Sequence, residues 1–287
     1  MMRPILLLPI VLLAAGCDRV KTIPLDFVPA VAAFKGTEHV VVVAGPAKRD
    51  VHIEIMDLAA GKPIGARDLG VRLSASPKIA ISDDGALLAA ERADRGIGVW
   101  RVESGKLVAK LPGFAEKTSP FAISRNYDEV IVGTLRWRIE GAKLMGVADA
   151  RVARRLIGHG GGQALSRDDR LVAIAIESEV RPGMRRPRLE LHREPGGDLV
   201  HAFDLDEPAS GGLLTRISAD ARFVLLENRH EGTTSLTIWK TASGSKAYRV
   251  EKPAGCGFAA WSADGSIVLL RCVESDSKMY LESHRID

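Results

Sequence analysis

A repeat with a period of 42 to 52 residues is the feature of this 287-residue chain that most restricts its fold. In five segments a short apolar stretch ends in serine, and a polar turn and an aliphatic run follow. The serines are Ser82, Ser124, Ser166, Ser218 and Ser262, which are 42, 42, 52 and 44 residues apart. A sixth segment, Val31 to Gly45, has the same shape without the serine. Self-similarity at this period predicts an array of equivalent structural units.

Each unit reads as four β-strands. The apolar stretch and the aliphatic run predict two strands, and segments such as "VHIEIMD" and "SLTIWKT" predict a third. In three units a turn follows with glycine at Gly61, Gly105 or Gly244, where a positive φ is expected. The predicted fourth strands are "PIGARDL", "LVAKLPG", "VARRLIG", "DLVHAFD" and "KAYRVEK". Helical periodicity is nearly absent, so the sequence predicts an all-β chain built from the four-stranded blades of a β-propeller.

Several short motifs carry a resemblance to a known group of proteins. These motifs are Gly158-His159, the run from Ser82 to Leu88, Trp100-Arg101 and Trp239-Lys240. With them the chain resembles the degenerate WD-repeat-like β-propellers of bacteria. It departs from the WD pattern because it has no Trp-Asp pair and only one Gly-His. The resemblance therefore implies the fold and no particular function. The two tryptophans are expected to pack between blades.

The ring is expected to close through the N-terminal part of the chain. The last unit supplies only three strands before Asp287, and the segment "KTIPLDF", Lys21 to Phe27, has the length of the missing outer strand. We therefore expect a single domain over residues 18–287, with residues 21–30 closing the ring and residues 31–287 forming the blades. Six four-stranded blades result.

The first seventeen residues have the pattern of a secretion signal. Arg3 precedes an apolar run from Ile5 to Ala15, which is shorter than the ~20 residues that span a bilayer. The run ends in Ala-Ala-Gly-Cys17, which resembles the lipobox of bacterial lipoproteins; an ordinary secretory signal with an incidental cysteine is the alternative. The resemblance implies that Cys17 is acylated, for example with palmitate, and anchors the chain on the periplasmic side of the cell envelope. Asp18 resembles the signal for retention at the inner membrane.

The other two cysteines predict a disulfide, and the net charge gives no indication of nucleic-acid binding. An exported chain meets an oxidising compartment, so Cys256 and Cys272 are expected to form a disulfide; two buried thiols are the alternative. They lie symmetrically about Asp264, at the turn of the last repeat, which would make them cross-strand partners. A net charge of +4 is too weak to indicate nucleic-acid binding.

The segment from His159 to Gly162, "HGGG", allows two interpretations. It is similar to the oxyanion loop of lipases and esterases, but the Gly-x-Ser-x-Gly nucleophile motif of those enzymes does not occur. It also lies where a propeller repeat would carry Gly-His. We therefore favour the structural interpretation.

One concentrated group of basic residues is a candidate contact surface. The loop predicted between the second and third strands of blade four contains Arg181, Arg185, Arg186 and Arg188. Arginines can bind lipid phosphates or an acidic partner. The alternative is a solvated loop.

Four charged residues are candidates for a pocket on the channel. Glu91, Glu227 and Arg271 each lie nine residues after a repeat serine, and Glu177 lies near the same level. The alternative is that they are exposed strand ends. The seven histidines show no metal-ligand spacing, so no metal or cofactor is expected.

These patterns favour a membrane-anchored, monomeric propeller lipoprotein that binds a protein or peptide of the cell envelope through its loops. The alternative is a lactonase or hydrolase of the propeller type with a metal in the central channel. That alternative requires Glu91, Glu177 and Glu227 to converge at the channel. A third possibility is a small-molecule sensor subunit that uses the channel as a pocket. Fold analogy alone does not decide between these functions.

Overall fold

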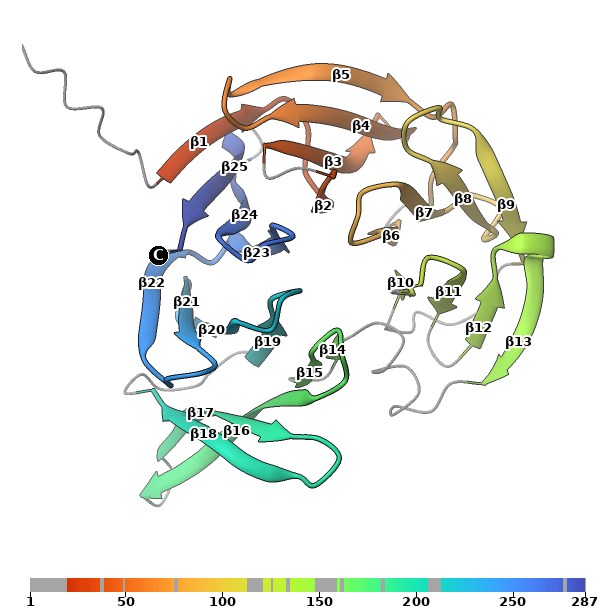
Figure 1. Ribbon diagram of the computed structural model, residues 1–287. Helices are drawn as coiled ribbons and strands as arrows, with labels where there is room; N and C mark the ends of the chain where they lie inside the picture. The colour runs from red at the N-terminus through yellow and green to blue at the C-terminus, as the bar shows by residue number, and fades with distance from the viewer. Residues whose placement is uncertain are drawn as a thin grey trace, which may run out of the picture.

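The chain forms six antiparallel β-sheets that surround a central axis, as in a six-bladed β-propeller (Figure 1). The computed structural model describes residues 20–36, 39–48, 50–74, 77–112, 121–124, 126–132, 135–147, 159–160, 163–181, 184–205, 213–275 and 278–286. Within these residues, no helix is long and apolar enough to cross a membrane.

The first three blades each contain four strands, from the inner strand to the outer one. Blade one contains β2 (Val31–Phe34), β3 (Val40–Ala47), β4 (Asp50–Asp57) and β5 (Lys62–Asp68). Blade two contains β6 (Ile79–Ile81), β7 (Leu87–Glu91), β8 (Ile97–Arg101) and β9 (Leu107–Leu111). Blade three contains β10 (Phe121–Ile123), β11 (Glu129–Val132), β12 (Leu135–Arg138) and β13 (Lys143–Val147), with the short 3₁₀ helix η1 (Glu140–Ala142) before β13.

Of the other three blades, blade five has the same four-stranded order, blade four has a fifth strand, and blade six combines the last three strands of the chain with its first strand. Blade four contains β14 (His159–Gly160), β15 (Gln163–Leu165), β16 (Leu171–Arg181), β17 (Met184–Arg193) and β18 (Asp198–Asp204). Blade five contains β19 (Leu213–Ile217), β20 (Phe223–His230), β21 (Thr233–Lys240) and β22 (Lys246–Pro253). Blade six contains β23 (Cys256–Trp261), β24 (Ile267–Ser275), β25 (Lys278–Arg285) and β1 (Val20–Leu25).

The predicted ring closure is confirmed. Strand β1 pairs antiparallel with β25, with Ile23 opposite Leu281, and so supplies the outer strand of the last blade. Ile23 is 1% exposed and lies in a core cluster that joins residues of blades one and six.

Apolar packing between neighbouring blades holds the ring together. Trp100 of blade two lies in one core cluster with Val42 and Ile53 of blade one. Trp239 of blade five lies in another with Leu189 and Leu191 of blade four. Both tryptophans therefore pack between blades, as the sequence predicts.

The repeat serine organises the turn between the first two strands of a blade. In blade four, the Ser166 hydroxyl donates to Asp168 Oδ1 at 2.6 Å and accepts the backbone N–H of Leu171 at 2.9 Å. This hydrogen bond lowers the pKa of the Asp168 carboxyl, although burial opposes the shift. The four other repeat serines make the equivalent pair of bonds, at Ser82, Ser124, Ser218 and Ser262. The serine recurs because its hydroxyl satisfies a backbone donor at the start of the second strand.

Replacing Ser166 with alanine should therefore lower the free energy of unfolding by about 1 kcal/mol, because the partly buried Leu171 amide loses its acceptor. The measurement is urea denaturation followed by circular dichroism. Ser104→Ala is the matched control, since Ser104 is exposed and accepts only a 3.3 Å bond from Lys106 N. Equal losses in the two variants would contradict this role.

The glycine turns between the third and fourth strands also match the prediction. Gly61, Gly105 and Gly244 have φ of 65°, 66° and 69°. Each donates its N–H to the carbonyl of the charged residue four positions earlier. A side chain other than glycine is strained at such angles.

The predicted disulfide is confirmed. Cys256 and Cys272 lie opposite each other on β23 and β24, with their Cα atoms 4.0 Å apart, and are bonded to each other. Both are buried, with 1% and 0% exposure. The bond therefore fastens the hairpin at its open end, away from the turn at Asp264.

Replacing both cysteines with serine should cost about 3 kcal/mol of unfolding free energy, because the bond closes a loop of 16 residues in the unfolded chain. Urea denaturation of the double variant measures this. Wild-type protein in excess reductant serves as the control and should unfold at nearly the same midpoint as the variant. If the oxidised and reduced proteins unfolded at one midpoint, the bond would not stabilise the fold.

Two sequence predictions are wrong. Residues 152–158 do not form the fourth strand of blade three, because β13 occupies that place after a short hairpin that includes η1; residues 151–158 lie outside the described part of the chain. The arginine-rich segment is not a loop, because β16 and β17 continue to Arg181 and Met184 in paired register. The extra length of blade four therefore lengthens a hairpin.

Candidate functional site

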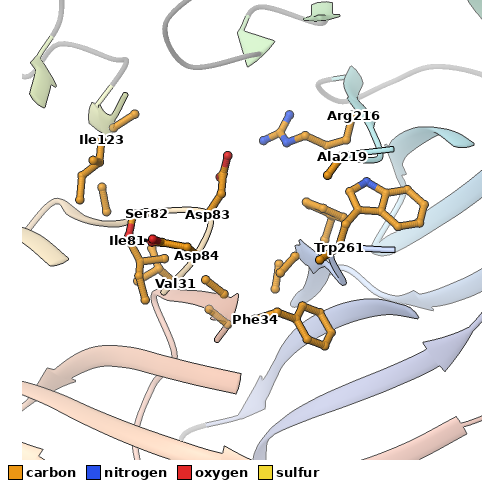
Figure 2. A pocket seen from close by; sticks show the side chains of 18 of the residues that line it. Val31, Phe34, Ile81, Ser82, Asp83, Asp84, Ile123, Arg216, Ala219 and Trp261 are labelled. Atoms are coloured by element: carbon orange, nitrogen blue, oxygen red, sulfur yellow. Dashed lines mark hydrogen bonds between the residues drawn. The ribbon is translucent and has the colours of Figure 1, made fainter. Parts of the chain in front are cut away.

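A cavity of about 460 Å³ lies on the axis of the propeller (Figure 2). Its lining comes from the inner strands of all six blades, β2, β6, β10, β15, β19 and β23. Most of the lining is apolar, with small side chains such as Ala80 and Ala122 and larger ones such as Ile81 and Trp261. This is the size range of a pocket for a small ligand or for a short segment of a partner chain.

One repeat position marks the site. The residue two places before the repeat serine is alanine in four repeats, and alanine also holds the equivalent position of blade one, as the backbone pairing of Lys35 with Val40 shows. The alanines are Ala33, Ala80, Ala122, Ala164 and Ala260. In blade five the residue is Arg216. A long cationic side chain therefore enters the cavity where blades one, two, three and six contribute an alanine to the lining.

Arg216 is held by few contacts. Its guanidinium points into the cavity (Figure 2), donates one hydrogen bond to the Thr215 carbonyl at 2.8 Å, and lies 5.7 Å from the centre of the Phe258 ring. Burial lowers the pKa of Arg216 to about 10, and the negative charges of Glu227 and Asp83 partly oppose this shift. At that pKa the side chain is still cationic at neutral pH.

Arg271 adds a second cation to the lining. It lies on β24 opposite Gly257, and its Nη1 donates to the Pro29 carbonyl at 3.1 Å. Burial lowers the pKa of Arg271, the like charge of Arg229 lowers it further, and Glu227 opposes both. Neither Arg271 nor Arg216 forms an ion pair with a carboxylate of the described residues.

Glu227 lies behind the cavity wall, with only 2% exposure. Its Oε1 accepts two hydrogen-bonding contacts from Arg229, at 2.9 and 2.8 Å, and its Oε2 accepts the backbone N–H of Phe258 at 2.9 Å. A Cβ on Gly257 would lie 3.2 to 3.4 Å from Arg229 Nη2 and the two Glu227 oxygens, so glycine leaves room for the pair. Glu227 therefore joins blades five and six and is already fully engaged.

The opposite side of the cavity is acidic. Asp83 of blade two points into the space from beside Ser82 (Figure 2). Asp84 also contributes to the lining but accepts hydrogen bonds from the Ser82 hydroxyl and the Ala86 N–H. Burial raises the pKa of Tyr127 on this side, and the charges of Asp84 and Asp83 raise it further, while Arg167 lowers it. The cavity thus has two cations at blades five and six, two carboxylates at blade two, and a further cation, Arg167, at blade four.

The predicted pocket residues do not all meet. Arg271 lines the cavity, and Glu227 lies directly behind it. Glu91 ends β7 and Glu177 lies exposed on β16, in two different blades, and neither belongs to the lining. The three glutamates therefore do not converge on the channel. Among the described residues, no group of three His, Cys, Asp or Glu side chains is arranged to hold a metal ion.

The four arginines of the proposed contact surface lie on the hairpin of β16 and β17. Arg188 pairs with Glu190 at 3.0 Å and with Asp204 at 3.3 Å. The Arg186 backbone lies opposite Ser178. The side chains of Arg181 and Arg185 lie outside the described part of the structure, as does Cys17.

Arg216, Arg229 and Asp83 are site residues that the sequence interpretation missed. For Arg216 a signal was present, because it is the single departure from an alanine column of the repeat. Arg229 and Asp83 have no such signal, since nothing in their local sequence distinguishes them from other exposed charges.

The fold and the cavity define the class of this protein: it is a six-bladed β-propeller with a charged axial cavity. No protein-family model and no curated protein matches the chain. Among solved structures, it is similar to Kuenenia stuttgartiensis hydrazine synthase, at 13% identity and a TM-score of 0.45, over 84% of this chain and 73% of that one. It is also similar to the β-propeller domain of Myceliophteria thermophila Cps50 (Swd1), at 11% identity and a TM-score of 0.48, over 91% and 98%. The assignment of the fold rests on the strand order of the six sheets.

Proposed function

We propose that this chain is a binding protein of the bacterial cell envelope, anchored by acyl chains on Cys17, which receives part of a protein or peptide partner in its axial cavity. One observation carries the proposal: the inner strands enclose a mostly apolar space, and two of the three arginines that line it, Arg216 and Arg271, are largely buried and form no ion pair with a carboxylate of the described residues. Buried cations without counter-charges are costly, and a partner that supplies the charge would bind there.

Binding is favoured over the hydrolase alternative by the positions of the acidic residues. A propeller hydrolase with a metal would need several carboxylates at the channel. Glu227 is occupied by Arg229 and the Phe258 amide, and Glu91 and Glu177 lie outside the lining. We therefore do not propose the hydrolase function.

The anchor would hold the propeller close to a membrane. Strand β1 begins at Val20, so only two residues separate it from Cys17, a span of about 10 Å at ~3.5 Å per residue. Asp18 favours the inner membrane. A tethered propeller can then present its cavity and its loops to partners in the envelope.

In-cell photocrosslinking tests this proposal. A photoreactive amino acid at Ala219, on the exposed rim of the cavity, should capture a discrete partner that mass spectrometry identifies. The same amino acid at Ala66, exposed on the outermost strand β5, is the matched control and should capture none. Equal capture at both positions, or no capture at Ala219, would overturn the proposal.

Two further variants complete the experiment. Cys17→Ala should move the protein from the membrane fraction to the soluble fraction, because the anchor is lost. Replacing Arg181, Arg185, Arg186 and Arg188 with glutamine tests the hairpin as a contact surface. If the Ala219 crosslink disappears in that variant, the partner also contacts the hairpin; if it persists, the cavity suffices.

A further inference from the structure

We infer that the wall of the cavity between blades five and six binds a carboxylate carried on an apolar body, with Arg216 and Arg271 holding the carboxylate oxygens. This inference rests on the proposed binding function and specifies the chemistry of what is bound. A peptide C-terminus and a small organic acid share this chemistry.

The balance of charge at this wall is the first argument. Arg216, Arg229 and Arg271 surround a single carboxylate, Glu227. Arg229 takes one oxygen of Glu227 and the Phe258 amide takes the other. Two positive charges at the cavity are therefore left without a contact partner of opposite sign.

The unused hydrogen-bonding capacity is the second argument. A guanidinium has five N–H donors in a planar fork that matches a carboxylate. Arg216 and Arg271 each donate one hydrogen bond, to a backbone carbonyl. Both side chains therefore keep donors for an incoming anion. The lowered pKa of each shows that burial disfavours its charge, which a bound anion would relieve.

The rest of the lining indicates the body of the ligand. Around the arginines the cavity presents Phe258, Trp261 and Ile217, together with the alanines of the inner strands. A ligand that buries apolar groups against this surface binds favourably, whereas a hydrated inorganic ion does not gain from such contact. Asp83, on the opposite side, repels an anion and so directs it toward blades five and six.

Arg216→Ala is the central test, because alanine stands at this position in the other blades and the fold should accept it. The probes are N-acetyl-Ala-Leu with a free carboxylate, its C-terminal amide, and hexanoate, titrated into the full chain by calorimetry. The free carboxylate should bind at least about tenfold more tightly than the amide. Arg216→Ala should remove that preference, whereas Arg101→Ala, a change at an exposed arginine on β8, should keep it.

Asp83→Asn provides a change of opposite sign. Removing the opposing negative charge should strengthen carboxylate binding severalfold and leave the amide unchanged. If the acid and the amide bind equally to the wild-type protein, or if Arg216→Ala keeps the preference, the inference is wrong.

The same probes separate the sources of the carboxylate and separate this inference from the proposed function. Tighter binding of the peptide than of hexanoate indicates a peptide C-terminus, and equal binding indicates a small acid. A crosslink from Ala219 without a carboxylate preference would leave the proposed function standing and overturn the inference. A preference for carboxylates without any crosslinked partner would support the inference and overturn the protein or peptide partner.

Discussion

Replacing Ile23 with aspartate should abolish the cooperative unfolding transition of this protein. Ile23 is 1% exposed in β1 and packs in the cluster that joins blades six and one. An unpaired carboxylate there would lose its hydration without gaining a partner, and the strand that closes the ring would detach. We expect a loss of more than about 4 kcal/mol, which is a large part of the stability of an ordinary domain.

Thr22→Asp is the matched control. Thr22 is the neighbouring residue of the same strand, but its side chain is exposed. The substitution therefore introduces the same charge on the other face of the strand. This variant should cost no more than about 1 kcal/mol, since Thr22 is exposed although an aspartate there would lie opposite Glu282 of β25. Thermal unfolding by circular dichroism and limited proteolysis would compare the two. A wild-type transition in Ile23→Asp would show that the ring is stable without β1.

The blades and the ring closure could be predicted because their signals are local. A strand with one face buried alternates in sequence, and each Ser turn and Gly turn places a recognisable residue at a fixed offset. Blade three departs from this pattern because its last two strands are short. Lys143–Val147 directly follows η1 and forms the outer strand, whereas the more strand-like residues 152–158 lie outside the described part of the chain.

The hairpin of blade four was misread for a related reason. Charged residues and Pro187 make its tip look like a loop, yet Pro187 lies opposite Glu177 of β16 and its carbonyl accepts the Leu205 N–H at 3.0 Å. A proline is tolerated there because it stands at the end of the β17–β18 pairing rather than within it.

The cavity could be predicted only in part, because it is assembled from six inner strands that lie far apart in the chain. Arg271 and Glu227 share a repeat position, yet one lines the cavity and the other lies behind its wall. Glu227 can stay behind the wall because Gly257 has no side chain, which leaves room there for the ion pair between Glu227 and Arg229. No periodicity in the sequence carries that information.

Replacing Glu227 with leucine should cost about 2 kcal/mol of unfolding free energy, because the Phe258 amide loses its acceptor and a half-exposed arginine, Arg229, loses its ion-pair partner. The change also removes a negative charge whose field favours the charged forms of Arg216 and Arg271, although neither of them contacts it. Glu227→Gln should cost less, because its amide oxygen can still accept from Phe258. Urea denaturation gives both values.

Two comparisons make the cause specific. Glu103→Leu removes an exposed carboxylate and should change stability by less than about 0.5 kcal/mol. Adding Arg216→Ala to Glu227→Gln should recover about 1 kcal/mol or more, because one of the cations that lost its counter-charge is then absent. If Arg216→Ala changed the unfolding free energy by the same amount with and without the Glu227 carboxylate, the two charges would not be coupled. Glu227 would then not stabilise the charged form of Arg216.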